Sequence, residues 1–298
     1  MESVTQKRGL SLWVLAARPK TLWAAVAPVL IGTAMAIEAG GFHAPSAFFA
    51  LLGAVLIQIG TNFSNDYSDF LKGADTGERK GPLRVTQAGL VTPEQMRRAT
   101  ALIFFLALLS GIYLIVRGGW PVLLIGVLSI VSGILYTAGR YSLAYLGLGD
   151  LFVLIFFGPV AVGGTYYVQT LTIEPAVLAM GVGAGLLSVC ILLSNNIRDV
   201  EEDRAAGKKT LVVRFGRGFG VALYAVCAVT ALLIPASIYL ITGRHPFILL
   251  TLLLLVPAMV NVRKFVATRE TAALNPLLGA SARLLLIYSL VFSATWVI

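Results

Sequence analysis

The chain has 298 residues, of which 58% are hydrophobic and only 12% are charged. Soluble globular domains carry roughly 25% charged residues, so an ordinary soluble enzyme, a disordered chain and a nucleic-acid-binding domain are excluded. The formal net charge is nevertheless +9, from 23 Lys and Arg against 14 Asp and Glu, and the placement of these few charges is informative. Cys190 and Cys227 both fall in apolar stretches and predict no zinc site.

Apolar segments of the length that crosses a bilayer, about 20 residues, recur along the whole chain. They lack the polar faces at helical spacing that buried helices of a soluble protein would show. The first follows Arg18 and Lys20 directly and is succeeded by others, which argues against a cleaved signal peptide. We predict an all-α, polytopic membrane protein with about nine transmembrane helices around a central cavity, in one domain covering residues 1–298. The predicted spans are 22–37, 46–63, 99–116, 120–138, 148–168, 176–194, 219–241, 247–262 and 279–297.

The distribution of basic residues predicts the orientation in the membrane. With the N-terminus in the cytoplasm, 21 of the 23 Lys and Arg residues lie on the cytoplasmic side, and only Arg117 and Arg244 lie outside. Cytoplasmic loops of membrane proteins are enriched in Lys and Arg in this way. The basic excess therefore needs no nucleic-acid partner, and the loops after the second and sixth spans are expected to be cytoplasmic.

Acidic residues concentrate in the same two loops. If the second span continues as a helix, Asn65 and Asp69 are four residues apart and share a face. Asn195, Asp199 and Asp203 repeat this interval after the sixth span and would share a face of a second helix. Like charges at this spacing destabilise a helix, so a bound cation is expected to offset the repulsion. Mg²⁺ prefers carboxylate and amide oxygens and commonly shares its coordination with substrate phosphates.

Basic residues follow each acidic cluster. The first cluster precedes Arg79, Lys80 and Arg84, and the second precedes Lys208 and Lys209. This repeated order predicts two similar halves, about 1–140 and 141–298, that face one another. Carboxylate-bound metal with flanking cations suits a diphosphate. The alternative, two solvated loops whose charges pair with each other, remains open, and the chain has no Walker or GxGxxG motif for nucleotide binding.

Over essentially its whole length the chain resembles the UbiA superfamily of intramembrane aromatic prenyltransferases, whose members carry two aspartate-rich motifs on cytoplasmic loops after the second and sixth spans. Asp75 stands two residues later than the third aspartate of the hydroxybenzoate branch, which makes the chain most similar to the branch that prenylates 1,4-dihydroxy-2-naphthoate in menaquinone biosynthesis. The similar segments are Arg18–Thr21, Asn65–Asp75, Gly81–Arg84, Gly147–Asp150, Asn195–Asp203 and Gly207–Arg214.

This resemblance implies that Mg²⁺ joins the two motifs to the diphosphate of a polyprenyl diphosphate, and that carbon dioxide leaves the dihydroxynaphthoate acceptor. It also implies a setting among the lipids of a bacterial inner membrane, with the active-site loops in the cytoplasm. The implied metal ligands are Asn65, Asp66, Asp69 and Asp75 for one ion and Asn196, Asp199 and Asp203 for another. The implied diphosphate-binding residues are Arg18, Lys20, Arg79, Lys80, Arg84, Lys208 and Lys209.

Four further residues are candidates for catalysis. Tyr67 and Tyr136, at the cytoplasmic ends of two spans, are placed to stabilise an allylic cation, although tyrosines are common at membrane interfaces. Arg140 belongs to a segment that resembles the family's acceptor and diphosphate region. Asp150 is the only carboxylate near the fourth loop, and we hypothesise that it contacts the naphthoate hydroxyls or promotes ring deprotonation. Its alternative role is a favourable charge at a helix N-terminus.

Three other functions compete with this interpretation. A different aromatic acceptor or a phytyl donor would retain the enzyme class. A secondary transporter would instead place polar groups near the bilayer midplane. Here the carboxylates gather at one face, which favours chemistry at the membrane surface.

Overall fold

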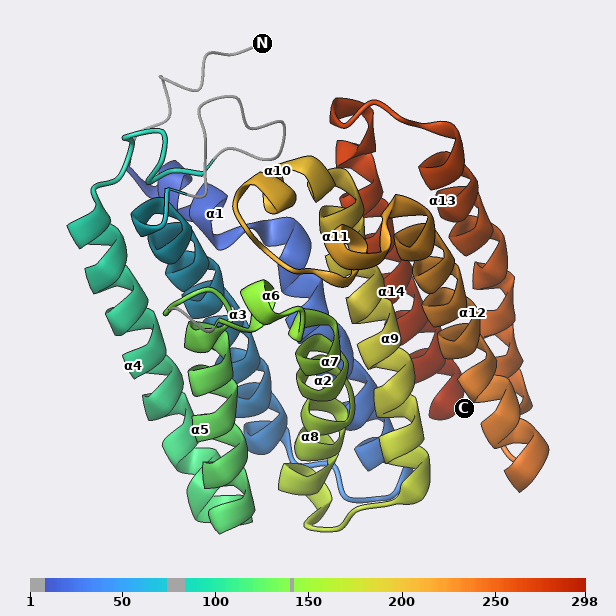
Figure 1. Ribbon diagram of the computed structural model, residues 1–298. Coiled ribbons are helices and arrows are strands. Elements are labelled where there is room, and N and C mark those ends of the chain that lie inside the picture. The colour runs from blue at the N-terminus through green and yellow to red at the C-terminus, as the bar shows by residue number, and fades with distance from the viewer. Residues whose placement is uncertain (1–8, 74–83, 140–141) are drawn as a thin grey trace.

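The computed structural model describes residues 9–73, 84–139 and 142–298 (Figure 1). Every regular element in this part of the chain is a helix, and the long helices form one bundle. Eight helical segments are long and apolar enough to cross a membrane, and α5 (Trp120–Leu135) is a shorter ninth. The prediction of an all-α polytopic protein with about nine spans is therefore confirmed. The eight are α2 (Pro19–Glu38), α3 (Ala44–Leu71), α4 (Pro93–Gly118), Gly149–Thr170, α9 (Pro175–Arg198), α12 (Arg217–Thr242), Pro246–Ala267 and Ala272–Trp296.

Three of these spans are built from more than one helical piece. They consist of α7 (Gly149–Ile155), η2 (Phe156–Val160) and α8 (Ala161–Thr170); η3 (Pro246–Leu254) and α13 (Leu255–Ala267); and η4 (Ala272–Leu274) and α14 (Asn275–Trp296). Four short helices complete the described elements: α1 (Leu10–Ala17), α6 (Leu143–Leu146), α10 (Val200–Ala205) and α11 (Leu211–Phe215). Helices α1, α10 and α11 lie at the same end of the bundle, uppermost in Figure 1.

Local sequence explains where the spans begin. Proline occupies the first turn of α2, α3, α4, α5 and α9, where its fixed φ suits the helix and its missing N–H removes no bond. At α4, Thr92 Oγ1 accepts from the Gln95 backbone N–H at 3.2 Å, while the Thr92 N–H donates to Gln95 Oε1 at 2.9 Å. This reciprocal pair satisfies two backbone N–H groups that have no partner within the helix.

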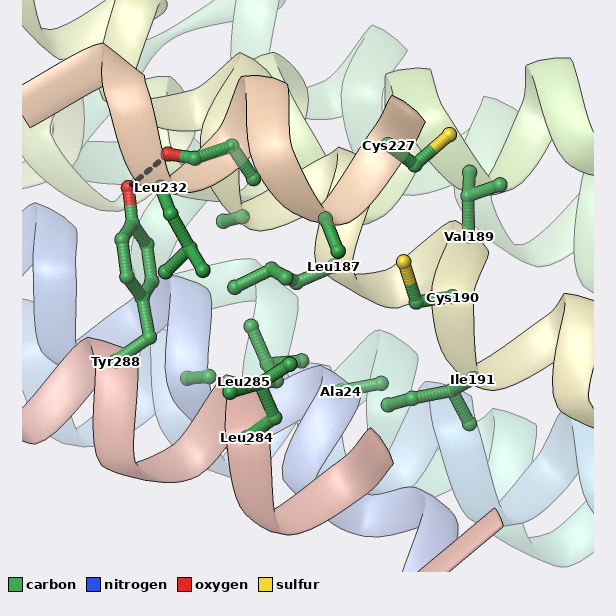
Figure 2. Close-up of a cluster of buried hydrophobic side chains, with 14 of the residues drawn as sticks. Ala24, Leu187, Val189, Cys190, Ile191, Cys227, Leu232, Leu284, Leu285 and Tyr288 are labelled. Carbon is green, nitrogen blue, oxygen red and sulfur yellow. Dashed lines mark hydrogen bonds between the residues drawn. The ribbon is translucent and has the colours of Figure 1, made fainter. Parts of the chain in front are cut away.

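The helices pack as two groups joined by α2 and α8. Helices α3, α4 and α5 form one side, and α9, α12, α13 and α14 form the other (Figure 1). A continuous apolar core fills the second group, where Leu187 of α9, Leu232 of α12 and Leu285 of α14 are fully buried (Figure 2). Tyr288 OH donates to the Ala231 carbonyl at 3.2 Å within this core. The division into two similar halves stays a prediction.

The fifth span is broken at its centre. Gly158 has φ −109° and ψ −114°, outside helical values, and Pro159 follows it in the π-helical turn η2. Next to the break, this span lies very close to α9. A Cβ added to Gly185 of α9 would lie only 2.3 Å from the Leu154 carbonyl oxygen. Small residues permit such close backbone approach between membrane helices. The approach fixes α7 beside α9 at the end of the bundle where the acidic clusters lie.

Candidate active site

Two adjoining cavities lie between the helices. The first, here the charged cavity, has a volume of about 300 Å³ and is lined by both acidic clusters. The second, here the apolar cavity, has a volume of about 360 Å³ and is bounded by α2, α3, α4, α5, α9 and the segment from α7 to α8. Because the two cavities share lining residues, they adjoin one another. The shared lining residues are Arg18, Thr21, Asn65, Tyr136, Leu192 and Asn195.

The first acidic cluster lies on the last turns of α3. The helix continues to Leu71, beyond the predicted span of 46–63, and this places Asn65 and Asp69 one turn apart in the lining of the charged cavity. Asp66 is also buried, but its Oδ2 accepts from the Val85 backbone N–H at 3.3 Å and it does not line the cavity. Two neighbouring carboxylates of the motif therefore have different environments.

Asp69 is the acidic residue at the centre of this lining. Its side chain is 1% exposed and its Oδ2 forms an ion pair with Arg84, while Lys208 Nζ lies 3.9 Å from the same oxygen. The other oxygen, Oδ1, is buried and receives no hydrogen bond from any described residue. A buried acceptor without a donor is costly, so Asp69 is a candidate ligand for a cation at the cavity wall.

The second acidic cluster spans a helix boundary rather than one helix. α9 ends at Arg198, and Asp199 has non-helical φ and ψ before α10 begins. The expectation of a single helix through 195–203 is therefore wrong. At the break, Nε and Nη2 of Arg198 donate to the two oxygens of Asp199, and Nη2 also donates to Asn195 Oδ1 at 2.9 Å. Asp199 and Asp203 both line the charged cavity.

Lys208 joins the two clusters. Its Nζ lies 3.0 Å from Asp203 Oδ1 and 3.9 Å from Asp69 Oδ2. Burial raises the pKa of Asp203, Lys208 opposes this shift, and the charges of Asp199 and Asp69 raise the pKa further. Carboxylates from both halves of the chain thus lie close enough to repel one another, and cationic groups in the cavity offset that repulsion.

A lysine on the first loop holds the segment after α5 against the first cluster. Lys72 Nζ donates to the Thr137 carbonyl at 2.5 Å and to Ser142 Oγ at 3.2 Å, and lies 3.9 Å above the Tyr145 ring. Thr137 Oγ1 in turn donates to Asn65 Oδ1 at 2.6 Å. These contacts keep neighbouring Tyr136 at the junction of the two cavities. Burial raises the pKa of Tyr136 well above its usual range, so the phenol remains neutral.

Comparison with known proteins identifies the family. Residues 25–293 match the model of the UbiA prenyltransferase family. The chain belongs to this family. It is 36% identical over 287 residues to the 1,4-dihydroxy-2-naphthoate octaprenyltransferase of Escherichia coli, covering 94% of this chain and 93% of that protein. It is 41% identical over 207 residues to the protein of the same name from Mycobacterium tuberculosis, covering 68% and 70% of the two chains.

The fold is likewise that of solved members of the family. A UbiA homologue from Archaeoglobus fulgidus, solved with GPP and Mg²⁺ bound, aligns with a TM-score of 0.65 over 95% of this chain and 99% of that chain. Sequence identity to it is 17%, so this likeness establishes the fold alone. The family relationship supports the use of a divalent metal by this chain.

The donor set of the charged cavity fits Mg²⁺. Its lining offers carboxylate and amide oxygens, and Oδ1 of Asp69 is left without a donor among the described residues. In the described part of the chain, no three Asp, Glu, His or Cys side chains lie close enough to hold one ion alone. Mg²⁺ typically takes one or two protein carboxylates and completes its coordination with water and substrate phosphates. The arrangement therefore suits an ion that is shared with a diphosphate.

Ten of the residues predicted from the sequence line the charged cavity. They are Arg18, Lys20, Asn65, Asp69, Arg84, Tyr136, Asn196, Asp199, Asp203 and Lys208. Lys20 forms no ion pair with any described residue, and cations outnumber carboxylates five to three in this lining when Arg198 is included. The cavity is therefore suited to an anion.

Other predicted residues lie elsewhere. Tyr67 packs against an apolar cluster that includes Ala16 and Met96, and Lys209 is exposed; neither lines a cavity. Asp150 is 8% exposed in the first turn of α7 and is also absent from both linings. The predictions for Asp75, Arg79, Lys80 and Arg140 concern positions outside the described residues.

Sequence reasoning missed several residues that build the site. The sequence assigned no site role to Arg198, although it pairs with Asp199 and lines the cavity. Asn195 was expected only to share a helix face with Asp199 and Asp203, and neither Thr137 nor Lys72 was assigned a role in the site. The adjacency of Arg198 and Asp199 was the available signal for that pair. The contacts of Lys72 and Thr137 join segments far apart in the chain and have no such signal.

Proposed function

We propose that this protein transfers a polyprenyl group from polyprenyl diphosphate to 1,4-dihydroxy-2-naphthoate, releasing diphosphate and carbon dioxide, as a step of menaquinone biosynthesis. The observation that carries the proposal is the meeting of both acidic clusters at a charged cavity that adjoins an apolar one. The names of the relatives that share 36–41% identity support the choice of acceptor.

The charged cavity would bind the diphosphate of the donor. Lys20 and Lys208 lie in its lining beside Arg18, whose backbone has a left-handed conformation (φ 51°) at the corner between α1 and α2. Positive groups fixed in place stabilise the negative charge that develops as the C–O bond breaks. Both electrons of that bond leave with the diphosphate.

The divalent metal would be held by residues of both clusters. We assign Asn65 and Asp69 to one side and Asn196, Asp199 and Asp203 to the other. When bound, the ion neutralises the leaving diphosphate and increases its tendency to depart.

The apolar cavity would hold the reacting carbons away from water. Its walls are mostly aliphatic and aromatic, and Tyr136 lies where it meets the charged cavity. The electron-rich face of a tyrosine ring stabilises a nearby cation, here the allylic cation of the donor. The ring carbon that bears the carboxylate forms the new C–C bond. The bond between this carbon and the carboxylate then breaks, its electrons restore the aromatic ring, and carbon dioxide leaves.

The proposal predicts a specific set of products. Purified protein in lipid nanodiscs, supplied with Mg²⁺, a polyprenyl diphosphate and 1,4-dihydroxy-2-naphthoate, is expected to yield prenylated naphthoquinol, diphosphate and carbon dioxide in equal amounts. Mass spectrometry and a coupled diphosphate assay measure these products. The same reaction with 4-hydroxybenzoate serves as the control for acceptor identity. Folded protein that forms product with neither acceptor would refute the transferase assignment.

A phytyl donor is the second candidate. The 2-carboxy-1,4-naphthoquinone phytyltransferase of Synechocystis is 33% identical over 232 residues, covering 76% of this chain. Competition between phytyl diphosphate and polyprenyl diphosphate in the same assay decides between them, because the preferred donor has the higher kcat/KM.

We also propose that the N-terminus and the charged cavity face the cytoplasm of a bacterial inner membrane. The protein offers a direct test, because both native cysteines are buried and give little background labelling. Cysteine is introduced at exposed positions at opposite ends of the bundle, as Glu201→Cys and Thr172→Cys. In intact spheroplasts an impermeant maleimide is expected to label Thr172→Cys, whereas Glu201→Cys reacts only after permeabilisation. The reverse pattern would overturn the orientation.

A further inference from the structure

Gln58 lines the apolar cavity and carries a buried hydrogen-bond acceptor that has no donor among the described residues. It lies on α3, two turns before Asn65, and is only 8% exposed. Its Nε2 donates to Asn62 Oδ1 at 3.4 Å, whereas its Oε1 is buried and receives no hydrogen bond from any described residue. Buried amide oxygens nearly always have a donor, so an unsatisfied one on a side chain that lines a cavity points to a ligand there.

The hydrogen bonds of the neighbouring corner determine which atom of Gln58 is free. Thr21 Oγ1 donates its hydrogen to the Arg18 carbonyl at 2.9 Å and therefore accepts from Asn62 Nδ2 at 3.1 Å. Asn62 Nδ2 also donates to the Ala17 carbonyl at 2.9 Å, which uses both of its hydrogens. Asn62 Oδ1 must then face Gln58 and accept from its Nε2. The group of Gln58 left without a partner is therefore its acceptor oxygen.

The chemistry of that oxygen excludes the isoprenoid tail as its partner. A polyprenyl chain has no hydrogen-bond donor and would leave Oε1 unsatisfied. In 1,4-dihydroxy-2-naphthoate, the 1-hydroxyl hydrogen-bonds to the adjacent carboxylate, whereas the 4-hydroxyl remains free to donate. Gln58 lies about 10 Å along the helix axis from Asn65, a depth that a bicyclic ring placed beside the diphosphate reaches.

We propose that Gln58 Oε1 accepts a hydrogen bond from the 4-hydroxyl of the aromatic acceptor, and that Gln58 is a specificity-determining residue for a hydroquinone. This inference rests on the proposed function. A site built around a buried acceptor rejects an analogue that lacks the matching hydroxyl. It equally disfavours a ring carbonyl at that position, since two acceptor oxygens would then face one another.

Binding of two ligands to two proteins tests this proposal without turnover. The ligands are 1,4-dihydroxy-2-naphthoate and 1-hydroxy-2-naphthoate, which lacks only the 4-hydroxyl, and Kd is measured by calorimetry in nanodiscs. Wild-type protein is expected to bind the second ligand about tenfold more weakly, the effect of one neutral hydrogen bond in a buried site. Gln58→Met, similar in size but without the acceptor, is expected to bind both ligands within twofold of each other.

Gln169 supplies a matched control. It is 2% exposed and its Oε1 also lacks a donor among the described residues, but it lines neither cavity. Gln169→Met is therefore expected to retain the tenfold preference. In a steady-state assay, Gln58→Met should raise the KM of the acceptor and leave the KM of the polyprenyl diphosphate within twofold.

The role of Gln58 and the proposed function can be refuted independently of each other. Equal affinity of wild-type protein for the two ligands overturns the inference even if Gln58→Met fails to fold. A preserved preference in folded Gln58→Met, or an equal rise in both KM values, also overturns it. Binding of dihydroxynaphthoate without prenyl transfer would refute the proposed function and leave the role of Gln58 standing.

Discussion

Replacing Asp69 with Asn is expected to lower kcat about a thousandfold, the upper end of the effect of removing one preorganised electrostatic group. Asp69 is buried, faces the charged cavity, and is the first-cluster carboxylate that lies near Lys208 of the second loop. Asn keeps the shape and an oxygen for Arg84 but removes the negative charge that a divalent ion requires. The Mg²⁺ concentration needed for half-maximal activity should therefore rise together with the loss of kcat.

The structural consequence of this change needs its own measurement. Asp69 pairs with the buried Arg84, and breaking a buried ion pair can destabilise a protein by about 3–5 kcal/mol. Thermal unfolding of Asp69→Asn in nanodiscs establishes whether the protein remains folded at the assay temperature. Glu201→Gln is the matched control, because Glu201 is an exposed acid that pairs with Arg204 beside the second cluster. A folded Asp69→Asn protein with activity within tenfold of wild type would contradict the metal assignment.

Replacing Lys208 with Met is expected to lower kcat about a hundredfold. Lys208 approaches carboxylates of both clusters, and a cation in this position stabilises the diphosphate as it leaves. Because this interaction strengthens as charge develops on the leaving group, kcat should fall by a larger factor than the KM of the donor rises.

The neighbouring lysine provides the comparison. The sequence predicts both Lys208 and Lys209 at the diphosphate, but the structure leaves Lys209 exposed and outside the cavity lining. Lys209→Met is expected to change kcat less than threefold, since an exposed charge is screened by water and salt. Equal losses of kcat in Lys208→Met and Lys209→Met, measured in the same prenyl-transfer assay, would contradict the assignment of Lys208, and not Lys209, to the diphosphate.

The sequence predicted the architecture well because bilayer constraints act locally. Each span must satisfy its own backbone hydrogen bonds, so its length and apolar composition are visible without knowing its neighbours. The prediction was less accurate where side chains compete with the helix. Arg198 pairs with Asp199 at the point where α9 ends, inside a segment that the spacing treated as one helix.

The part of the candidate site that lies within one helix could also be predicted, because it depends only on residue spacing. Spacing along α3 correctly placed Asn65 and Asp69 on one face, because both belong to one helix. Spacing could not show that Asp66 accepts from Val85 instead of facing the cavity, since that contact depends on how the segment after α3 folds back. Nor could it show that Lys72 reaches the carbonyl of Thr137.

The sequence by itself thus determined the number and character of the spans, the gathering of charge at one end, and the family, since all three reside in composition and local motifs. Only the tertiary structure decided which charges meet, that Lys208 lies between Asp69 and Asp203, and that Gln58, with an unsatisfied oxygen, lines the apolar cavity. The physical reason is that helix periodicity fixes a face within one helix. Which face meets which neighbour depends on packing between helices that are distant in the chain.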